Sequence, residues 1–136
     1  MLIAGLGFRE SADVASLKDA LTAAGGIEGV AALATAEAKS GAQALQSLAA
    51  EFGLPVIAVA PAALMAVVTL TRSDRVMELF GTGSLAEAAA LVAGGHGARL
   101  LGPRAISCDG LATAALAVVG AAETEASSKP GEGAVI

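Results

Sequence analysis

Short apolar runs alternate with segments of helical periodicity along the first half of the chain, and this alternation constrains the fold more than any other feature. Residues 2–6, 30–34 and 55–60 form apolar runs of the length expected for buried strands. The intervening segments carry apolar residues at helical spacing. Because helices that join successive strands favour right-handed crossovers, the pattern predicts a sheet with parallel strands.

Capping residues mark the limits of the first two expected helices. Ser11 is a suitable N-cap for a helix that carries Val14, Leu17 and Leu21 and ends at Gly25. The second helix is expected over residues 42–52, with Gly53 closing it, and residues 35–41 are expected to be the loop before it. Both helices have one apolar face to pack on a sheet.

The middle of the chain is less regular. Residues 61–67 are expected to form a short helix, and residues 68–71 are compatible with a strand or with extended chain. Ser73 is expected to cap the next helix. Ser84 and Glu87 have the spacing of a capping box, which starts a further helix that ends at Gly94.

Two more apolar runs, residues 98–102 and 111–119, are expected to be strands joined as a hairpin. The sequence therefore predicts a three-layer α/β/α fold around a central mixed, mostly parallel sheet of five or six strands. We expect one domain over residues 1–120. Residues 121–136 are rich in Glu, Ser, Lys, Pro and Gly and are expected to be a flexible tail.

Charge and composition bear on location and partners. Residues 52–71 contain no charged side chain for 20 residues, but Pro61 interrupts the run, so we expect no membrane span. The N-terminus lacks a basic region before its apolar residues and is not typical of a signal peptide, so a cytoplasmic protein is expected.

A net charge of −5 without a basic run argues against nucleic acid as a binding partner. Because the small side chains of an alanine-rich core bury little apolar area, we expect modest stability, which self-association into a homo-oligomer would increase.

Polar side chains follow several of the expected strands. Gly5-x-Gly7-x-Arg9 follows the first, and Thr35 and Lys39 follow the second. Arg72 and Arg75 flank Ser73, and Arg104 follows the strand that ends at residue 102. Ligands of open α/β sheets bind at the carboxyl ends of the strands. We therefore expect Arg9, Thr35, Lys39 and Ser73 to line one cleft for an anionic ligand, with Arg104 at its rim.

Other chemistries are less well supported by the residues. The glycines at 5 and 7 lack the third glycine of a dinucleotide-binding fingerprint, so no cofactor is expected. His96 is the single histidine and Cys108 the single cysteine, which leaves a metal site or a catalytic triad without partners. The residues nominate no catalytic group.

The order of these residues resembles the CobE/CbiG C-terminal domain family of cobalamin (vitamin B12) biosynthesis. The matching pieces cover residues 1 to about 120. Phe8 is a departure, since family members often have cysteine there, and this weakens any thiol chemistry in the loop. The matching pieces are Gly5-Leu6-Gly7-Phe8-Arg9, Leu33-Ala34-Thr35 with Lys39, Gly53-Leu54-Pro55, Ser73, Val76, Gly81, Glu87-Ala88-Ala89-Ala90-Leu91, Pro103-Arg104 and Ala112-Thr113-Ala114.

The resemblance implies a role with a precorrin or other corrinoid intermediate, and with other cobalamin-biosynthesis enzymes as possible partners. Two activities follow from it. Stand-alone family members of the CobE type, which this chain resembles most, suggest a tetrapyrrole-binding accessory protein. CbiG-type members open the lactone of a cobalt-precorrin and release acetaldehyde, so a hydrolase is the alternative. The expected ligand-binding residues, from the strand exits and the matching pieces, are Gly5, Gly7, Arg9, Thr35, Lys39, Ser73, Gly81, Gly83, Glu87 and Arg104.

The implied ligand suits the predicted cleft. Corrin precursors are broad apolar rings fringed with carboxylates, which Arg9, Lys39, Arg72 and Arg104 are suited to bind through charge-assisted hydrogen bonds. An alanine-lined crevice is suited to the face of the ring. We prefer the binding protein over the hydrolase because the sequence offers no convincing acid–base pair.

Overall fold

A computed structural model describes residues 1–120, and residues 121–136, the expected flexible tail, lie outside the described residues. One sheet forms the centre of the molecule, in the order β3-β2-β1-β6-β4, with β5 pairing with β6 as well. β1, β2 and β3 run parallel, whereas β6 is antiparallel to β1, β4 and β5. The predicted mixed sheet is thereby confirmed. The strands are β1 (Leu2–Phe8), β2 (Val30–Ala36), β3 (Val56–Val59), β4 (Arg99–Leu100), β5 (Ala105–Ile106) and β6 (Ala112–Val118).

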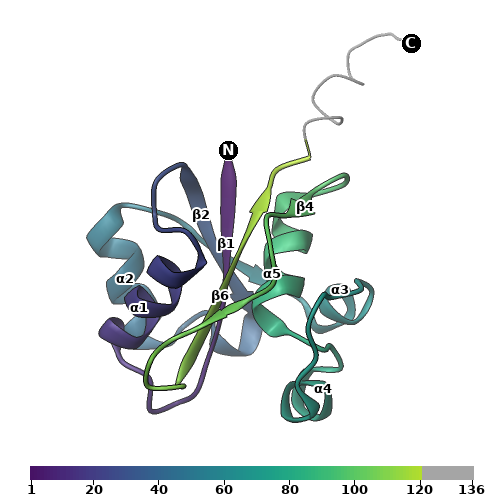
Figure 1. Cartoon of the computed structure of the whole chain (residues 1–136), viewed down its shortest axis with the longest axis horizontal. Coiled ribbons are helices and arrows are strands. Elements are labelled where there is room, and N and C mark those ends of the chain that lie inside the picture. The colour runs from purple at the N-terminus through teal and green to yellow at the C-terminus, as the bar shows by residue number, and fades with distance from the viewer. Residues whose placement is uncertain (121–136) are drawn as a thin grey trace, which may run out of the picture.

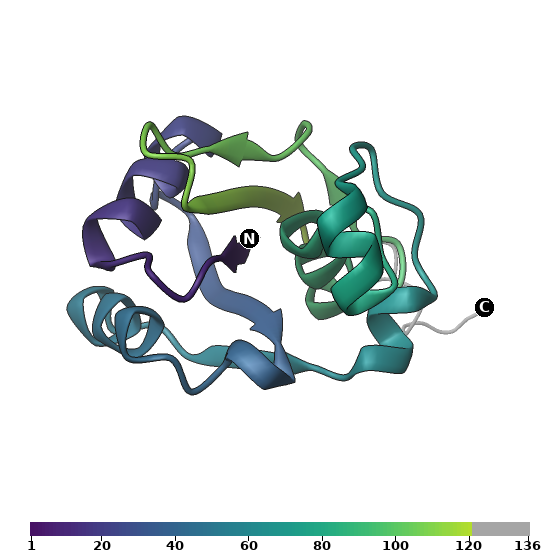
Figure 2. The ribbon, with the colours of Figure 1, turned by 90° about the horizontal axis from the view of Figure 1, so that it is seen from below.

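Helices cover both faces of the sheet, which confirms the three-layer architecture. Figures 1 and 2 show α1 and α2 together on one face and α5, with α3 and α4 beside it, on the other. A short 3-10 helix, η1, follows β2 directly. The helices are α1 (Val14–Ala24), η1 (Glu37–Lys39), α2 (Gln43–Phe52), α3 (Pro61–Met65), α4 (Asp74–Phe80) and α5 (Leu85–Gly94).

The two faces of the sheet are packed with different side chains. The face under α1 and α2 is filled by leucines such as Leu17, Leu45 and Leu48, all of which are fully buried. The other face is filled largely by alanines, because α5 lies very close to the sheet. A Cβ placed on Gly5 of β1 would come within 1.9 Å of the carbonyl oxygen of Ala86 in α5. Gly5 is therefore required for the packing of this helix on the sheet.

The structure corrects the expected start of the first helix. Asp13, and not Ser11, is the N-cap of α1. The Asp13 carboxylate accepts a hydrogen bond from the backbone N–H of Ser16, and the Ser16 hydroxyl accepts one from the backbone N–H of Asp13. This reciprocal pair satisfies two backbone donors, which a serine at position 11 cannot do from its place in the preceding turn.

The expected end of the second strand is also corrected. β2 continues to Ala36, so Thr35 is a strand residue and does not belong to the loop. Its side chain is fully buried, and its hydroxyl donates to the carbonyl oxygen of Leu6 at 2.8 Å. Residues 68–71, which were compatible with a strand or with extended chain, pair with no strand of the described sheet.

In the part of the chain that the structure describes, no single helix has the length and apolar character needed to cross a membrane. One pair, α4 and α5, meets the criteria of length and composition together but is bent by 54° at its break. The uncharged run over residues 52–71 is divided between the end of α2, strand β3 and helix α3.

Candidate functional site

An open cleft lies where the carboxyl end of β1 meets the amino end of β6. Phe8 of β1 pairs with Ala112 of β6, so the antiparallel register brings these two ends together. The 3-10 helix after β2, helix α4 and strand β5 supply the other walls. The cleft encloses about 230 Å³ and opens to solvent. Its lining residues are Gly7, Phe8, Arg9, Lys39, Ser73, Arg75, Val76, Leu79, Phe80, Leu85, Arg104, Ile106, Gly110, Leu111, Ala112 and Thr113.

Positive charge is concentrated in this cleft. Of the seven Lys and Arg residues within residues 1–120, four line it, namely Arg9, Lys39, Arg75 and Arg104. No aspartate or glutamate is among the residues that line it within the described chain. Because the protein as a whole has a net charge of −5, this clustering creates a local field of the opposite sign. The cleft is therefore suited to an anion with several negative groups.

Lys39 sits between two aromatic rings in the cleft. Its Nζ lies 4.9 Å from the centroid of the Phe8 ring and 6.0 Å from that of Phe80. Partial burial lowers the pKa of Lys39, and the nearby Arg75 guanidinium lowers it further, although Glu10 opposes both effects. The rings favour the ammonium form while burial disfavours it. A bound carboxylate would therefore relieve an unfavourable environment for this charge.

Apolar side chains line the outer part of the cleft. Leu79 of α4 is 58% exposed and Ile106 of β5 is 54% exposed, so both offer apolar surface to a ligand. Val76, Phe80 and Leu85 continue this apolar surface inward. The combination of cations and open apolar walls matches a ligand that is itself amphipathic.

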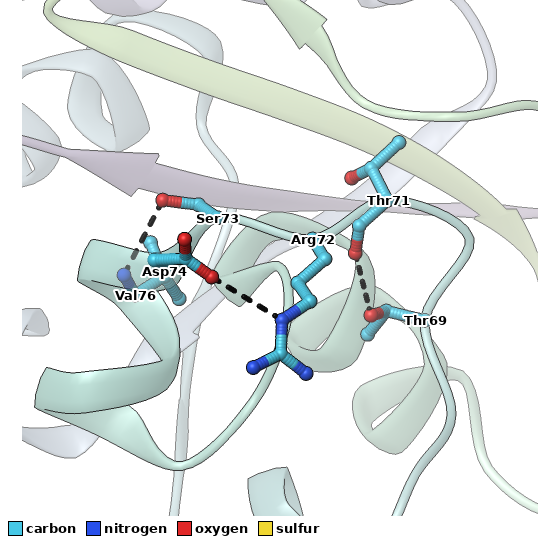
Figure 3. A network of polar contacts seen from close by, with 6 residues as sticks. All are labelled: Thr69, Thr71, Arg72, Ser73, Asp74 and Val76. Atoms are coloured by element: carbon cyan, nitrogen blue, oxygen red, sulfur yellow. Dashed lines mark hydrogen bonds and ion pairs between the residues drawn. The ribbon is translucent and has the colours of Figure 1, made fainter.

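Ser73 anchors the wall that α4 contributes. Its hydroxyl accepts a hydrogen bond from the backbone N–H of Val76 at 3.3 Å, as the predicted N-cap requires. Figure 3 shows this cap beside the exposed pair of Arg72 and Asp74, whose Nε and Oδ1 atoms lie 3.4 Å apart. The backbone N–H of Ser73 also donates to the carbonyl oxygen of Gly83 at 2.7 Å. α4 is thereby fixed against the start of α5.

The structure brings together half of the expected ligand-binding residues. Gly7, Arg9, Lys39, Ser73 and Arg104 line the cleft. Gly5, Thr35 and Glu87 are buried behind it, and Gly81 and Gly83 line a second depression next to α3. Arg72, expected to reach the ligand fringe, lines that second depression too.

The expected capping box at the start of α5 is half formed. The Ser84 hydroxyl accepts from the backbone N–H of Glu87, as predicted. The Glu87 carboxylate, however, accepts hydrogen bonds from Leu70, Thr71 and Arg104. These donors come from segments that the local spacing of Ser84 and Glu87 does not reveal, so the sequence pattern accounts for only one of the two side chains.

Residues that the sequence left outside the binding set also line the cleft. Arg75 was placed near Ser73, but the pattern gave no sign that its helix faces Lys39. Phe8 and Phe80 flank that lysine from two distant segments. The only sequence signal for Arg75 was its place two residues after Ser73, the N-cap of α4.

Of the residues considered for other chemistries, Gly5, His96 and Cys108 lie outside the cleft. Gly5 is covered by α5 and is not open to a dinucleotide pyrophosphate, whereas Gly7 lines the cleft. His96 and Cys108 are exposed and are not among the residues that line the cleft. Within residues 1–120, no group of three or more His, Cys, Asp or Glu side chains is placed to hold a metal ion.

The turn at the rim of the cleft is held by Asp109. Its carboxylate accepts hydrogen bonds from the hydroxyls of Ser107 and Ser16 and from the backbone N–H of Leu111. These hydrogen bonds lower the pKa of Asp109, and the bond from Ser107 has the largest effect. A lowered pKa in the folded state means that ionised Asp109 stabilises the fold above its unfolded pKa of about 3.9 and loses this effect as the pH falls.

Asp109→Asn is therefore expected to be less stable than wild type above about pH 4, with the difference shrinking toward more acidic pH. Denaturant unfolding of both proteins at a series of pH values measures this difference. A stability gap that stays constant from neutral to acidic pH would show that the carboxylate charge does not contribute.

Residues 2–117 match a family model described as cobalamin synthesis G C-terminus. The chain is similar to the crystal structure of CobE, a protein from the cobalamin (vitamin B12) biosynthetic pathway, with 34% identity and a TM-score of 0.74. This match covers 86% of this chain and 89% of that one. The search of curated proteins found no match.

A second solved structure, the cobalamin biosynthesis protein chiG from Agrobacterium tumefaciens, is 31% identical to the chain. Its TM-score is 0.65, and the match covers 88% of this chain and 98% of that one. Both matches cover more than four fifths of this chain.

Proposed function

Because the chain belongs to the cobalamin synthesis G C-terminus family and acts in cobalamin biosynthesis, we propose that its cleft binds a corrinoid intermediate through the carboxylates at the rim of the macrocycle. The observation that carries this proposal is the gathering of Arg9, Lys39, Arg75 and Arg104 in one cleft, with no acidic residue of the described part of the chain in its lining. Such cations bind carboxylates through charge-assisted hydrogen bonds.

The size of the cleft determines how such a ligand would bind. Its volume of about 230 Å³ is below the roughly 300–1,000 Å³ of pockets that enclose a drug-sized ligand. The cleft therefore takes one edge of the macrocycle, with the carboxylates of that edge meeting the cations. The remaining ring face lies against the exposed side chains of Leu79 and Ile106.

The lining favours binding over hydrolysis. Opening a lactone requires an activated water molecule or a nucleophile, and no His, Cys, Asp or Glu of the described chain lines the cleft. We therefore propose a tetrapyrrole-binding accessory protein, which holds its ligand in the cytoplasm for other enzymes of cobalamin biosynthesis.

One observation favours a lactone hydrolase as the second candidate. Burial and Arg75 lower the pKa of Lys39, and a lysine with a lowered pKa is able to act as a general base. In that case Lys39 would take a proton from the attacking water, while the neighbouring arginines stabilise the oxyanion formed on the lactone.

Incubation of the purified protein with a cobalt-precorrin lactone separates the two candidates. We expect a shift in the visible spectrum of the corrinoid and no acetaldehyde. Release of acetaldehyde that is lost in Lys39→Met, with the spectral shift retained, would establish the hydrolase instead. Absence of both signals would contradict either function.

Cys108→Ser and His96→Ala are expected to leave corrinoid binding unchanged within about twofold, since neither side chain lines the cleft. Titration of each variant by corrinoid absorbance measures this. A clear loss of affinity in either variant would mean that the binding surface extends well beyond this cleft.

A further inference from the structure

Glu87 is a buried carboxylate behind the cleft. It lies in the first turn of α5 and is completely inaccessible to solvent. Neither of the two ion pairs formed within residues 1–120 involves Glu87. A buried charge of this kind is costly unless hydrogen bonds compensate it. The amino end of α5, where backbone dipoles favour negative charge, contributes to that compensation.

Four donors converge on this carboxylate. Its Oε1 accepts from the backbone N–H groups of Leu70 and Thr71, at 2.6 and 3.0 Å. Its Oε2 accepts from the hydroxyl of Thr71 at 3.0 Å and from the backbone N–H of Arg104 at 2.8 Å. A carboxylate suits this set because it is an acceptor at both oxygens.

One of these donors, the N–H of Arg104, comes from a residue that lines the cleft, and the other three come from Leu70 and Thr71, which precede the α4 wall and themselves line the second depression. Residues 70–71 lead directly to Ser73 and α4, which carries Arg75, Leu79 and Phe80. Gly83 lets this segment pack tightly, since a Cβ there would lie 2.8 Å from the carbonyl oxygen of Thr71. On the other side, Arg104 comes just before β5 and is itself one of the residues that line the cleft.

We propose that Glu87 is a positioning residue that fixes the α4 wall and the Arg104 wall of the cleft at the separation a polycarboxylate ligand requires. The proposal rests on the proposed binding function. Glu87 does not reach the ligand, because its side chain is buried and its oxygens are occupied by the four donors. It acts through the backbone of residues 70–71 and 104.

Glu87→Gln tests this with almost no change in size. A glutamine oxygen can accept from Leu70 and Thr71, but its NH₂ group then faces the N–H of Arg104, which loses its acceptor. We expect the amide hydrogen of Arg104 to exchange about 10-fold faster than in wild type. Affinity for cobyrinic acid, a corrin that carries free carboxylates, should fall by about 10-fold or more, since small misplacements of binding groups are costly.

Thr71→Val is the matched control in the same network. It removes the hydroxyl donor, while the N–H groups of Leu70, Thr71 and Arg104 keep their acceptor. We expect binding within about threefold of wild type and unchanged exchange at Arg104. An equal loss of affinity in Thr71→Val and Glu87→Gln would overturn the specific role assigned to the Arg104 wall.

A second pair of variants serves if Glu87→Gln does not fold. Arg104→Ala removes the guanidinium and keeps the N–H, whereas Arg104→Pro removes both. Because the N–H of Arg104 donates to Glu87, we expect Arg104→Pro to bind cobyrinic acid about 10-fold more weakly than Arg104→Ala. Equal affinities of the two folded variants would overturn it.

The measurements also separate this inference from the proposed function. If wild type binds cobyrinic acid and folded Glu87→Gln binds it equally well, the positioning role is wrong and the binding function stands. If wild type does not bind it, the binding function is wrong. The exchange measurement needs no ligand, so unchanged exchange at Arg104 in Glu87→Gln overturns the positioning role in either case.

Discussion

Replacing Gly5 by alanine is expected to lower the free energy of unfolding by about 3 kcal/mol or more. A Cβ at this position would lie 1.9 Å from the carbonyl oxygen of Ala86 and 2.7 Å from the backbone nitrogen of Ala90. Overpacking of a core typically costs about 1–3 kcal/mol. The cost here is at the upper end or above, because the atoms in the way are helix backbone and α5 has to move as a body.

Gly41→Ala is the control for this variant. No atom lies within 4 Å of a Cβ at position 41, and its backbone does not need a positive φ. Its stability is expected to equal that of wild type or to exceed it slightly, since alanine restricts the unfolded chain. Denaturant unfolding compares the three proteins. A Gly5→Ala protein within about 1 kcal/mol of wild type would contradict the close contact of α5 with β1.

The double variant Arg9→Ala, Arg75→Ala is expected to bind cobyrinic acid more than about 100-fold more weakly than wild type. Each arginine lies in the cleft, and loss of a hydrogen bond to a charged group costs about 1.5–3 kcal/mol. Two such losses correspond to about 3 kcal/mol or more, and about 1.4 kcal/mol is a tenfold change in affinity. Absorbance titration of the corrinoid gives both dissociation constants.

The control for the double variant removes the same charge elsewhere. Arg72 and Arg99 are exposed and are not among the residues that line the cleft. Arg72→Ala, Arg99→Ala is expected to bind within a few-fold of wild type, because exposed charges outside the site act only through a screened field. Similar losses in the two double variants would show that net charge, and not the cleft, determines affinity.

The strands and helices were largely predictable because local patterns determine them. The end of α2 is an example: Gly53 adopts the left-handed conformation with φ of 64°, which glycine accommodates without cost. Ser73 likewise caps α4 as its position indicated. In such cases the residue that marks the boundary also makes the hydrogen bonds that create it.

The features of the fold and the cleft that the sequence did not predict depend on contacts between segments that are distant along the chain. Thr35 is buried because β2 runs on to Ala36, and only its pairing with β3 extends it that far. The role of Glu87 depends on donors 16 and 17 residues away in sequence. Periodicity and capping rules describe neighbours along the chain, so they predicted which residues are polar at the strand ends but not which of them face the cleft.

Carboxylate recognition is the central claim, and titration of the wild-type protein with cobyrinic acid and with its fully methyl-esterified form tests it most directly. The two ligands share the corrin ring and differ in whether the fringe carries charge. We predict that the acid binds at least about 10-fold more tightly than the ester at low ionic strength, and that added salt narrows this difference. Equal binding of acid and ester at low salt would contradict the account, because the cations of the cleft would then contribute nothing to recognition.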